Sequence, residues 1–263
     1  MPLIRAGAGN GRGGDPVVTL PWEQFCDFMR DCWEPGQHLA NVGPTGGGKS
    51  TVGVGLLSIR DFVLALDPKG EDETLEASGW TRVRRIPGEH MPMLGEDRKR
   101  WRRIWQDIAE GRPARVIVGG RADTDAQDTR LAELMRRAIA FARYSGGWTL
   151  YVDEFELMSS QRQANLGRYI ERMLITARRQ KTSVVTSFQA PAWVSKHALR
   201  QARFAVQYQT GSRGMIKSLA EDMGRDWREL AEGVDELDPF YILVIPRGPG
   251  GGPMILTTAP RIN

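Results

Sequence analysis

Eight consecutive residues, GPTGGGKS at 43–50, have the composition of a loop that binds the phosphates of a nucleotide. Backbone N–H groups from Thr45 to Thr51 would point at the β- and γ-phosphates, and a glycine allows this approach because it has no Cβ atom. Lys49 would neutralise phosphate charge, and the Ser50 hydroxyl would ligate Mg²⁺. The predicted nucleotide-binding residues are Gly43, Pro44, Thr45, Gly46, Gly47, Gly48, Lys49, Ser50 and Thr51.

Two adjacent acids end the apolar segment TLYVDE at 149–154. Asp153 would hold Mg²⁺ through water, and Glu154 would polarise the water that attacks the γ-phosphate. The alternative is an ordinary pair of solvated acids at the end of a strand. A phosphate loop about a hundred residues upstream favours the catalytic interpretation, because the two motifs together complete one hydrolytic site.

Gln189 follows the apolar run SVVTSF at 183–188. A neutral amide at this point could hydrogen-bond the γ-phosphate or the attacking water and so report hydrolysis to the rest of the domain. It could equally be a polar residue that merely ends a strand. The order of the motifs favours a sensor, because motor-type nucleotidases insert one strand between the strands that carry the phosphate loop and the acids. Small-molecule kinases instead carry an arginine-rich lid.

Arg178 and Arg179 precede that last strand. An arginine here could reach the γ-phosphate held by a neighbouring subunit of a ring, where its planar charge would stabilise the transition state. The alternative is a basic last helical turn, which the helix dipole favours. A helical projection places Arg179 on the same face as Arg168 and Arg172, whereas Arg178 lies off that face. Arg178 is therefore the preferred arginine finger, the residue that would act on the neighbouring subunit.

The elements that must position these residues alternate along the chain. The strand HLANV at 38–42 runs into the phosphate loop, and a helix follows it. Apolar runs at 62–66, 115–119, 149–153 and 183–188 then alternate with helical segments such as 127–144 and 164–179. This alternation predicts an α/β fold, a mostly parallel sheet flanked by helices. Together with the phosphate loop and the two acids, it resembles the RecA-like (ASCE) P-loop NTPase class.

The C-terminal part departs from that alternation. A strand at 204–208 and a helical stretch at 213–232 precede two apolar runs, FYILVI at 240–245 and MILTT at 254–258. The last two flank GPGGGP and predict an antiparallel hairpin with a wide loop.

The chain of 263 residues is long enough for one sizeable core, so we expect a single domain over 17–263. The glycine-rich start predicts a flexible arm over 1–16. No run approaches the roughly 20 apolar residues of a membrane span, so we expect an intracellular protein without a transmembrane segment. The net charge of +4 suits a polyanionic partner.

Taken together, GPTGGGKST, FVLALDPKGE at 62–71, TLYVDE and ITARRQKTSVVTSFQAP at 175–191 resemble the HerA/FtsK superfamily of DNA-pumping ATPases. The Asp-Pro-Lys-Gly sequence is similar to conjugative coupling proteins of the TraG type, and the spacing of Arg178 and Gln189 is similar to FtsK and SpoIIIE. The resemblance covers residues from about 36 to about 246. It implies ATP and Mg²⁺ as cofactors, double-stranded DNA as partner, and a homo-oligomeric ring, hexamer or pentamer.

Departures from these families narrow the expected function. FtsK and TraG proteins carry membrane helices and extra domains, and HerA proteins an N-terminal barrel; none is visible here. The chain resembles single-domain viral genome-packaging ATPases, which implies a DNA translocase in the host cytoplasm, attached to a procapsid through a portal or capsid vertex protein. Two alternatives stay open: a conjugative or mobile-element DNA-transfer ATPase with a membrane anchor protein, and an assembly or scaffold ATPase that does not move DNA.

A ring motor needs basic or polar loops that contact DNA phosphates without reading bases. The candidate loops are 119–127 and 159–168, with Arg162 and Arg168 as the predicted DNA-binding residues. The most basic segment, EDRKRWRRIW at 96–105, is typical of a solvated surface helix with two core-facing tryptophans, and the alternative is a docking surface.

Overall fold

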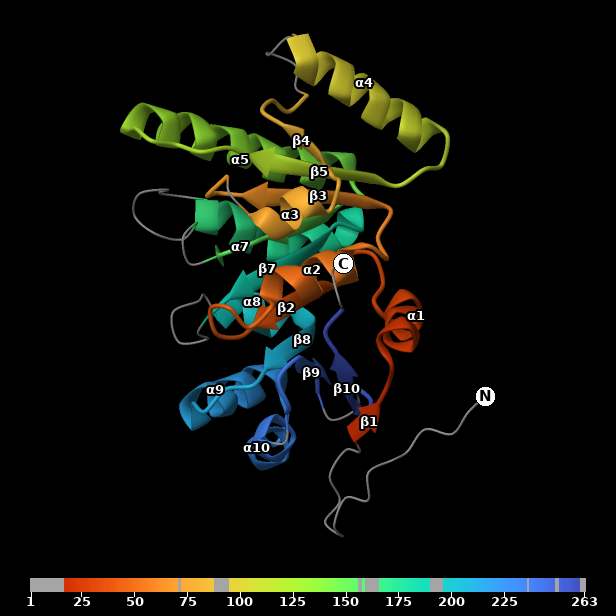
Figure 1. Ribbon diagram of the computed structural model, residues 1–263, viewed down its shortest axis with the longest axis vertical. Helices are drawn as coiled ribbons and strands as arrows, with labels where there is room; N and C mark the ends of the chain where they lie inside the picture. The colour runs from red at the N-terminus through yellow and green to blue at the C-terminus, as the bar shows by residue number, and fades with distance from the viewer. Residues whose placement is uncertain are drawn as a thin grey trace. The chain divides into compact units, whose positions relative to one another are not determined.

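The structure is a computed structural model that describes residues 17–70, 72–87, 95–155, 158, 166–189, 196–235, 237–248 and 251–260 (Figure 1). Its contacts divide the chain into two compact units. Unit 1 takes in residues 17–34, 38–53 and those from 187 onward, and unit 2 takes in 35–37 and 54–186. The predicted arm, 1–16, lies outside the described residues, and the single domain over 17–263 stays a prediction.

Unit 1 contains five strands in the order β1, β10, β9, β8, β2. The pairs β1–β10 and β2–β8 are parallel, while β9 runs antiparallel to both β8 and β10. The predicted C-terminal hairpin is therefore confirmed. The elements are β1 (Val17–Thr19), α1 (Trp22–Cys32), β2 (His38–Val42), α2 (Lys49–Leu57, whose first five residues belong here), α8 (Lys196–Gln201), β8 (Ala202–Tyr208), α9 (Arg213–Met223), α10 (Trp227–Asp235), β9 (Tyr241–Pro246) and β10 (Met254–Thr258).

Unit 2 contains five strands in the order β7, β6, β3, β5, β4, and all four pairs are parallel. The last two residues of β7 belong to unit 1. The elements are β3 (Phe62–Asp67), α3 (Glu73–Ala77), β4 (Thr81–Val83), α4 (Gly95–Ala109), β5 (Ala114–Gly119), α5 (Asp125–Ser145), β6 (Thr149–Val152), α7 (Leu166–Thr176), the 3₁₀ helix η2 (Ala177–Gln180) and β7 (Ser183–Phe188).

The predicted fold class is confirmed: the strands are mostly parallel and helices accompany them (Figure 1). Strands β6 and β7 are buried along their whole length, and β3 is buried from Val63 onward. Strands that are covered on both faces need a nearly continuous apolar sequence. For this reason these strands could be predicted from the sequence. The helix α5 packs on β3, β5 and β6 and begins at a capping box formed by Thr124 and Gln127.

The basic segment 96–105 forms most of α4, as predicted for a surface helix. Trp101 is 2% exposed, and its ring packs against Phe141 at a centroid distance of 5.3 Å. Trp105 is 42% exposed, so only one of the two tryptophans belongs to the core. The indole Nε1 of Trp101 donates to the carbonyl of Arg85 at 2.8 Å, which leaves no buried donor unsatisfied there.

Several elements differ from the sequence prediction, and the differences have identifiable causes. The helix expected over 164–179 ends at Thr176, because the chain tightens into η2 and then reaches Lys181 in the left-handed region (φ 54°). The stretch 213–232 is two helices, since Gly224 ends α9 with φ 68°. The strands β1 and β4 were not predicted; three residues are too few to show a periodicity. No helix within the described ranges is long and apolar enough to cross a bilayer.

Candidate nucleotide-binding site

The phosphate loop of unit 1 lies between β2 and α2. The Lys49 ammonium folds back over the loop and donates to the carbonyls of Gly43 at 2.9 Å and Pro44 at 2.8 Å. From the buried strand β2, the Asn41 amide donates to the Lys49 carbonyl at 2.9 Å and to the Ser187 hydroxyl at 3.2 Å. These contacts hold the start of α2 against the strand and keep the lysine at the loop.

The glycines of the loop are required for different reasons. Gly46 and Gly48 have φ of 74° and 84°, which a residue with a side chain adopts only at a cost, and a Cβ atom there would meet nothing within 4 Å. A Cβ atom on Gly43 would lie 2.5 Å from the ring of Tyr208 in β8. Gly43 is therefore needed for packing within the unit. The Gly47 N–H is engaged inside the loop by the Pro44 carbonyl at 3.1 Å.

The end of β7 lies beside the start of this loop. The Gly43 N–H donates to the carbonyl of Phe188 at 3.1 Å, and Gln189, the next residue, is exposed. In unit 2 the first four residues of β7 pair in parallel with β6, the strand that leads to the two acids. The strand expected after the acids is therefore present, and Gln189 follows its last residue.

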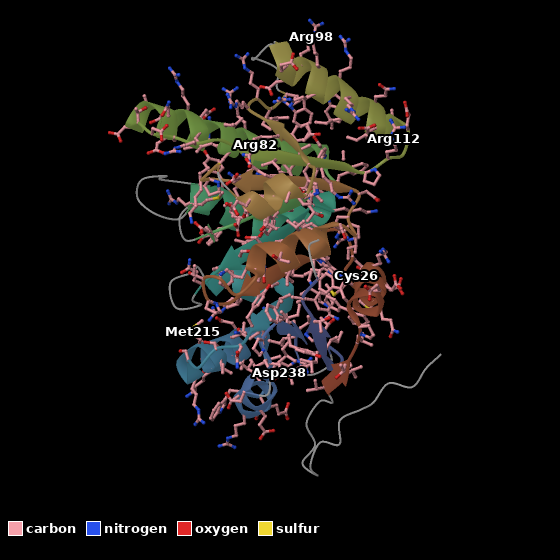
Figure 2. The ribbon with its side chains drawn as sticks, viewed as in Figure 1. Cys26, Arg82, Arg98, Arg112, Met215 and Asp238 are labelled. Atoms are coloured by element: carbon pink, nitrogen blue, oxygen red, sulfur yellow. The ribbon has the colours of Figure 1, made fainter. Side chains whose placement is uncertain are left out.

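A cavity of about 1370 Å³ opens from the phosphate loop within unit 1. Glycines 46–48 and Thr51 form one part of its lining. The start of α1, the end of β8 at Tyr208 and the segment 238–242 supply the rest, with Asp238 labelled in Figure 2. The loop thus adjoins a space much larger than a phosphate group needs.

The two acids of unit 2 follow the buried strand β6. Asp153 is mostly buried and accepts a hydrogen bond from the Tyr151 hydroxyl at 3.2 Å. Glu154 has a left-handed backbone (φ 52°), which is uncommon for a residue with a side chain, and its carboxylate pairs with the ammonium of Lys69. The carboxylates of Asp153 and Glu154 therefore both lie at the end of β6.

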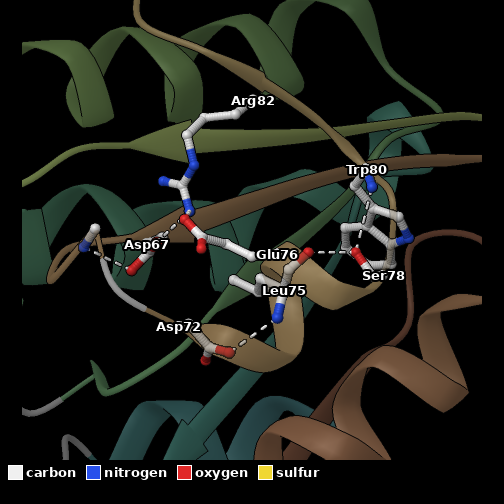
Figure 3. Close-up of polar contacts among 8 residues, drawn as sticks. Asp67, Asp72, Leu75, Glu76, Ser78, Trp80 and Arg82 are labelled. Carbon is white, nitrogen blue, oxygen red and sulfur yellow. Dashed lines mark hydrogen bonds and ion pairs between the residues drawn. The ribbon is translucent and has the colours of Figure 1, made fainter. Parts of the chain in front are cut away.

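A third carboxyl group adjoins Asp153. Burial, a hydrogen bond with Asp72 and the negative charges of Asp72 and Glu154 together raise the pKa of Asp153 to about 7, against a smaller lowering by Tyr151. Asp72 also caps α3, because its Oδ1 accepts from the Leu75 N–H at 2.9 Å (Figure 3). Sequence reasoning missed Asp72, and its position two residues after the strand-ending Asp-Pro-Lys-Gly is the one signal that it gave.

Lys69 and Asp72 belong to a connection whose base is fixed by a buried ion pair. Asp67, at the end of β3, accepts from the Gly70 N–H at 2.8 Å and from the Arg82 guanidinium at 2.8 Å (Figure 3). Arg82 also reaches Glu76 of α3 at 3.3 Å. The Asp-Pro-Lys-Gly motif therefore has a structural meaning: it closes a tight turn that holds Lys69 against Glu154.

Ser50, the second residue of α2, and Asp153 are the predicted ligands of Mg²⁺. Within the described ranges, no three Asp, Glu, His or Cys side chains are arranged to hold a metal ion. A nucleotide-bound Mg²⁺ needs only one or two protein ligands, since phosphate oxygens and waters complete its shell. Asp153 fits this role because a cation beside it would stabilise the ionised carboxylate, which burial and the neighbouring acids Asp72 and Glu154 disfavour.

The predicted arginines lie on exposed surfaces of unit 2. Arg178 and Arg179 are both exposed on η2, and Gly36 packs against the Arg178 backbone, where an added Cβ would lie 3.0 Å from its carbonyl oxygen. The helical projection assumed that one α-helix continues to residue 179, but α7 ends at Thr176 and both arginines lie on η2. The projection therefore gives no reason to prefer Arg178 over Arg179.

The predicted DNA contacts are only partly described. Arg168 is exposed on the first turn of α7, while Arg162 lies outside the described residues. In the other candidate loop, Arg121 pairs with Asp123 at 2.7 Å and the residues from Asp125 onward already belong to α5. That loop therefore offers less free positive charge than its sequence indicated.

Neither a protein-family model nor a curated protein sequence matches the chain. Among solved structures, the genome packaging NTPase B204 from Sulfolobus turreted icosahedral virus 2 matches with a TM-score of 0.57 at 14% identity, over 87% of this chain and 99% of that one. VirB4 of Thermoanaerobacter pseudethanolicus matches with a TM-score of 0.57 at 11% identity, over 86% and 89%.

The cytoplasmic domain of the type VII secretion ATPase EccC of Thermomonospora curvata matches with a TM-score of 0.50 at 15% identity, over 88% of this chain and 26% of that one. B204 has also been solved in complex with AMP, ATP-gammaS and AMPPCP. At these identities the likeness establishes the fold. The resemblance that the motifs predicted is confirmed at that level.

Proposed function

We propose that this protein is an ATPase that translocates double-stranded DNA, and specifically a viral genome-packaging motor that works as a homo-oligomeric ring. The observation that carries the proposal is β7: its first four residues pair with β6, the strand before the two acids, and its last residue, Phe188, accepts a hydrogen bond from the Gly43 N–H, so that Gln189 follows directly. A sensor at this point links the state of the γ-phosphate to the strand behind it, as a motor requires and a simple binding protein does not.

In the proposed mechanism the loop N–H groups and Lys49 bind the triphosphate, and Glu154 accepts a proton from the attacking water. Gln189 hydrogen-bonds the water or the γ-phosphate. Arg178 or Arg179 of a neighbouring subunit stabilises the charge of the transition state. Ser50 and Asp153 would hold Mg²⁺, which neutralises charge on the phosphate oxygens.

The likeness to the packaging NTPase B204 supports the packaging role, since that protein is covered almost completely by this chain. In this role the motor acts in the host cytoplasm on a procapsid, tethered by a portal or capsid vertex protein. Arg162 and Arg168 are the proposed contacts to DNA phosphates. The second candidate is a DNA-transfer ATPase that works with a membrane anchor protein, and the likeness of the fold to VirB4 is compatible with it.

The test is the ATPase rate with and without long double-stranded DNA, with the oligomer mass measured in each nucleotide state. We expect stimulation by DNA and a ring of five or six subunits when ATP is bound. Hydrolysis that is indifferent to DNA would favour an assembly ATPase. A stable monomer without stimulation under every condition would overturn the motor proposal.

A further inference from the structure

The cavity beside the phosphate loop has an aromatic and proline-rich wall that phosphate binding does not use. Trp22 and Pro21 line it from the start of α1, Tyr208 from the end of β8, and Pro239 and Phe240 from the turn before β9. These side chains surround the space that adjoins glycines 46–48. A ligand held by its phosphates at the loop would therefore extend into a chamber whose wall includes aromatic rings and prolines.

Phe240 is the exceptional member of this wall. Its side chain is 83% exposed, although large apolar side chains normally gain stability by burial. Its backbone is left-handed (φ 73°), an outlier for a bulky residue. Strain of this kind persists only where the surroundings impose it and is concentrated at functional sites.

The backbone around Phe240 is held by two hydrogen bonds. The Tyr241 N–H donates to the Asp238 carbonyl at 3.1 Å, and the Ala259 N–H, which follows β10, donates to the Phe240 carbonyl at 2.6 Å. The turn is thus fixed at both ends of the hairpin. The fold holds an exposed aromatic ring, on a strained backbone, at the lining of the cavity.

We propose that this cavity binds the nucleoside part of the nucleotide and that Phe240 is the platform on which the base stacks. The proposal rests on the proposed function, because it assigns the remainder of the same ligand. A base offers a flat π-face to an aromatic ring whatever its hydrogen-bonding groups, so stacking selects by ring area. The charged groups of the lining, Glu23 and Asp238, are exposed acceptors at its margin.

The aromatic lining of the cavity also indicates which class of nucleotide it binds. Both purines have a larger ring system than the pyrimidines and therefore stack over a larger area on an aromatic side chain. The site therefore takes purine nucleotides, both adenine and guanine, in preference to pyrimidine nucleotides.

The experiment compares the affinities of ADP, GDP, CDP and UDP with that of inorganic pyrophosphate, all with Mg²⁺, by calorimetry on the full chain. These probes share two phosphates and are not turned over. We expect the two purine nucleotides to bind more tightly than the two pyrimidine nucleotides and pyrophosphate. Phe240→Ala is expected to weaken ADP by roughly 5- to 150-fold, the range of base–aromatic stacking, and to leave pyrophosphate unchanged.

Two further variants separate ligand binding from structure. Phe240→Gly should lose ADP affinity as Phe240→Ala does, yet keep or raise the melting temperature, because glycine adopts a positive φ without strain. Tyr144→Ala removes another aromatic side chain of equal exposure, 80%, on α5 and should change nothing.

The outcomes distinguish this inference from the proposed function. If neither ADP nor pyrophosphate binds, the nucleotidase proposal fails. If pyrophosphate binds but ADP binds no more tightly, or if Phe240→Ala leaves ADP affinity unchanged, the phosphate site stands and the base platform is overturned. Equal affinity for purine and pyrimidine diphosphates would overturn the purine preference.

Discussion

Glu154 is the residue on which the proposed chemistry depends, and its surroundings are unusual. It sits on a left-handed turn directly after β6, and Lys69 pairs with its carboxylate. A carboxylate in this position is the kind of group that can accept a proton from an attacking water. Lys49 has a different task, since its ammonium lies at the phosphate loop and donates to the carbonyls of Gly43 and Pro44.

These positions predict two different defects. Glu154→Gln should still bind ATP but hydrolyse it roughly 10²- to 10⁴-fold more slowly, the usual contribution of a general base. Lys49→Ala should bind ATP poorly because phosphate charge is no longer neutralised. Nucleotide binding and steady-state turnover measured on the same preparations separate the two. The control is Glu73→Gln, an exposed acid on the first turn of α3. Normal turnover by Glu154→Gln would remove this residue from the mechanism.

Asp153 gives the protein a pH-dependent stability in the absence of metal. Its pKa is raised from 3.8 to about 7, so the folded state binds the proton more tightly than the unfolded state does. The resulting stabilisation is complete below about pH 4 and is lost as the pH rises through 7. We therefore expect the melting temperature in chelator to fall between about pH 4 and 7, by about 2–4 °C for each kcal/mol of stability lost, and to level off above pH 7.

The matched variant for this prediction is Asp153→Asn, which keeps the size of the side chain and cannot ionise. Its melting temperature should depend less on pH over the same range. Thermal denaturation of both proteins in parallel makes the comparison, since the other titrating groups are common to both. An equal slope in the two proteins would show that another group is responsible.

At the scale of elements, the connection from β3 to α3 positions Lys69 and Asp72 against the two acids. Gly70 is its critical residue: it has φ 71°, and a Cβ atom on it would lie 2.4 Å from the Gly120 carbonyl carbon and from the Arg121 nitrogen. Both contacts are backbone atoms of the segment after β5, so neither can move aside cheaply. The turn and the end of β5 are therefore packed against each other without space for a methyl group.

Gly70→Ala should destabilise unit 2 and disturb ATP hydrolysis. Gly79 offers a matched control, because it has the same φ of 71° but nothing within 4 Å of an added Cβ. Gly79→Ala should cost only the left-handed strain, about 1–2 kcal/mol, whereas Gly70→Ala adds a clash with backbone. Chemical denaturation gives both free energies of unfolding. Equal losses in the two variants would mean that the close approach at Gly70 is relieved easily.

At the scale of the whole molecule, the proposed ring is tested by the exposed arginines of η2. Subunits with Arg178→Ala keep their own phosphate loop and acids, and subunits with Lys49→Ala keep the arginine. If Arg178 acts on the neighbouring subunit, mixed rings should regain ATPase activity that neither variant has alone. Restoration only with Arg179→Ala in place of Arg178→Ala would move the finger by one residue. No restoration with either would place both arginines outside the catalytic site.

Much of the architecture could be predicted because the buried strands are short, nearly continuous apolar runs. The strands at 38–42 and 183–188 have the bounds that the sequence indicated, and the hairpin formed by β9 and β10 was expected from two such runs around a glycine-rich loop. The predictions that failed also have a physical explanation. The helix before Arg178 ended early because a tighter turn and a left-handed lysine follow it, and apolar spacing does not record either.

By itself the sequence determined the phosphate loop, the pair of acids and the α/β class, because each depends on residues that are adjacent along the chain. Only the tertiary structure revealed that the ring of Tyr208 leaves no room for a side chain at Gly43. It also revealed that Lys69 pairs with Glu154 and that Phe240 lines the cavity beside the loop. These relations join residues that are far apart in sequence. They are consequences of strand order and packing, which no local pattern encodes.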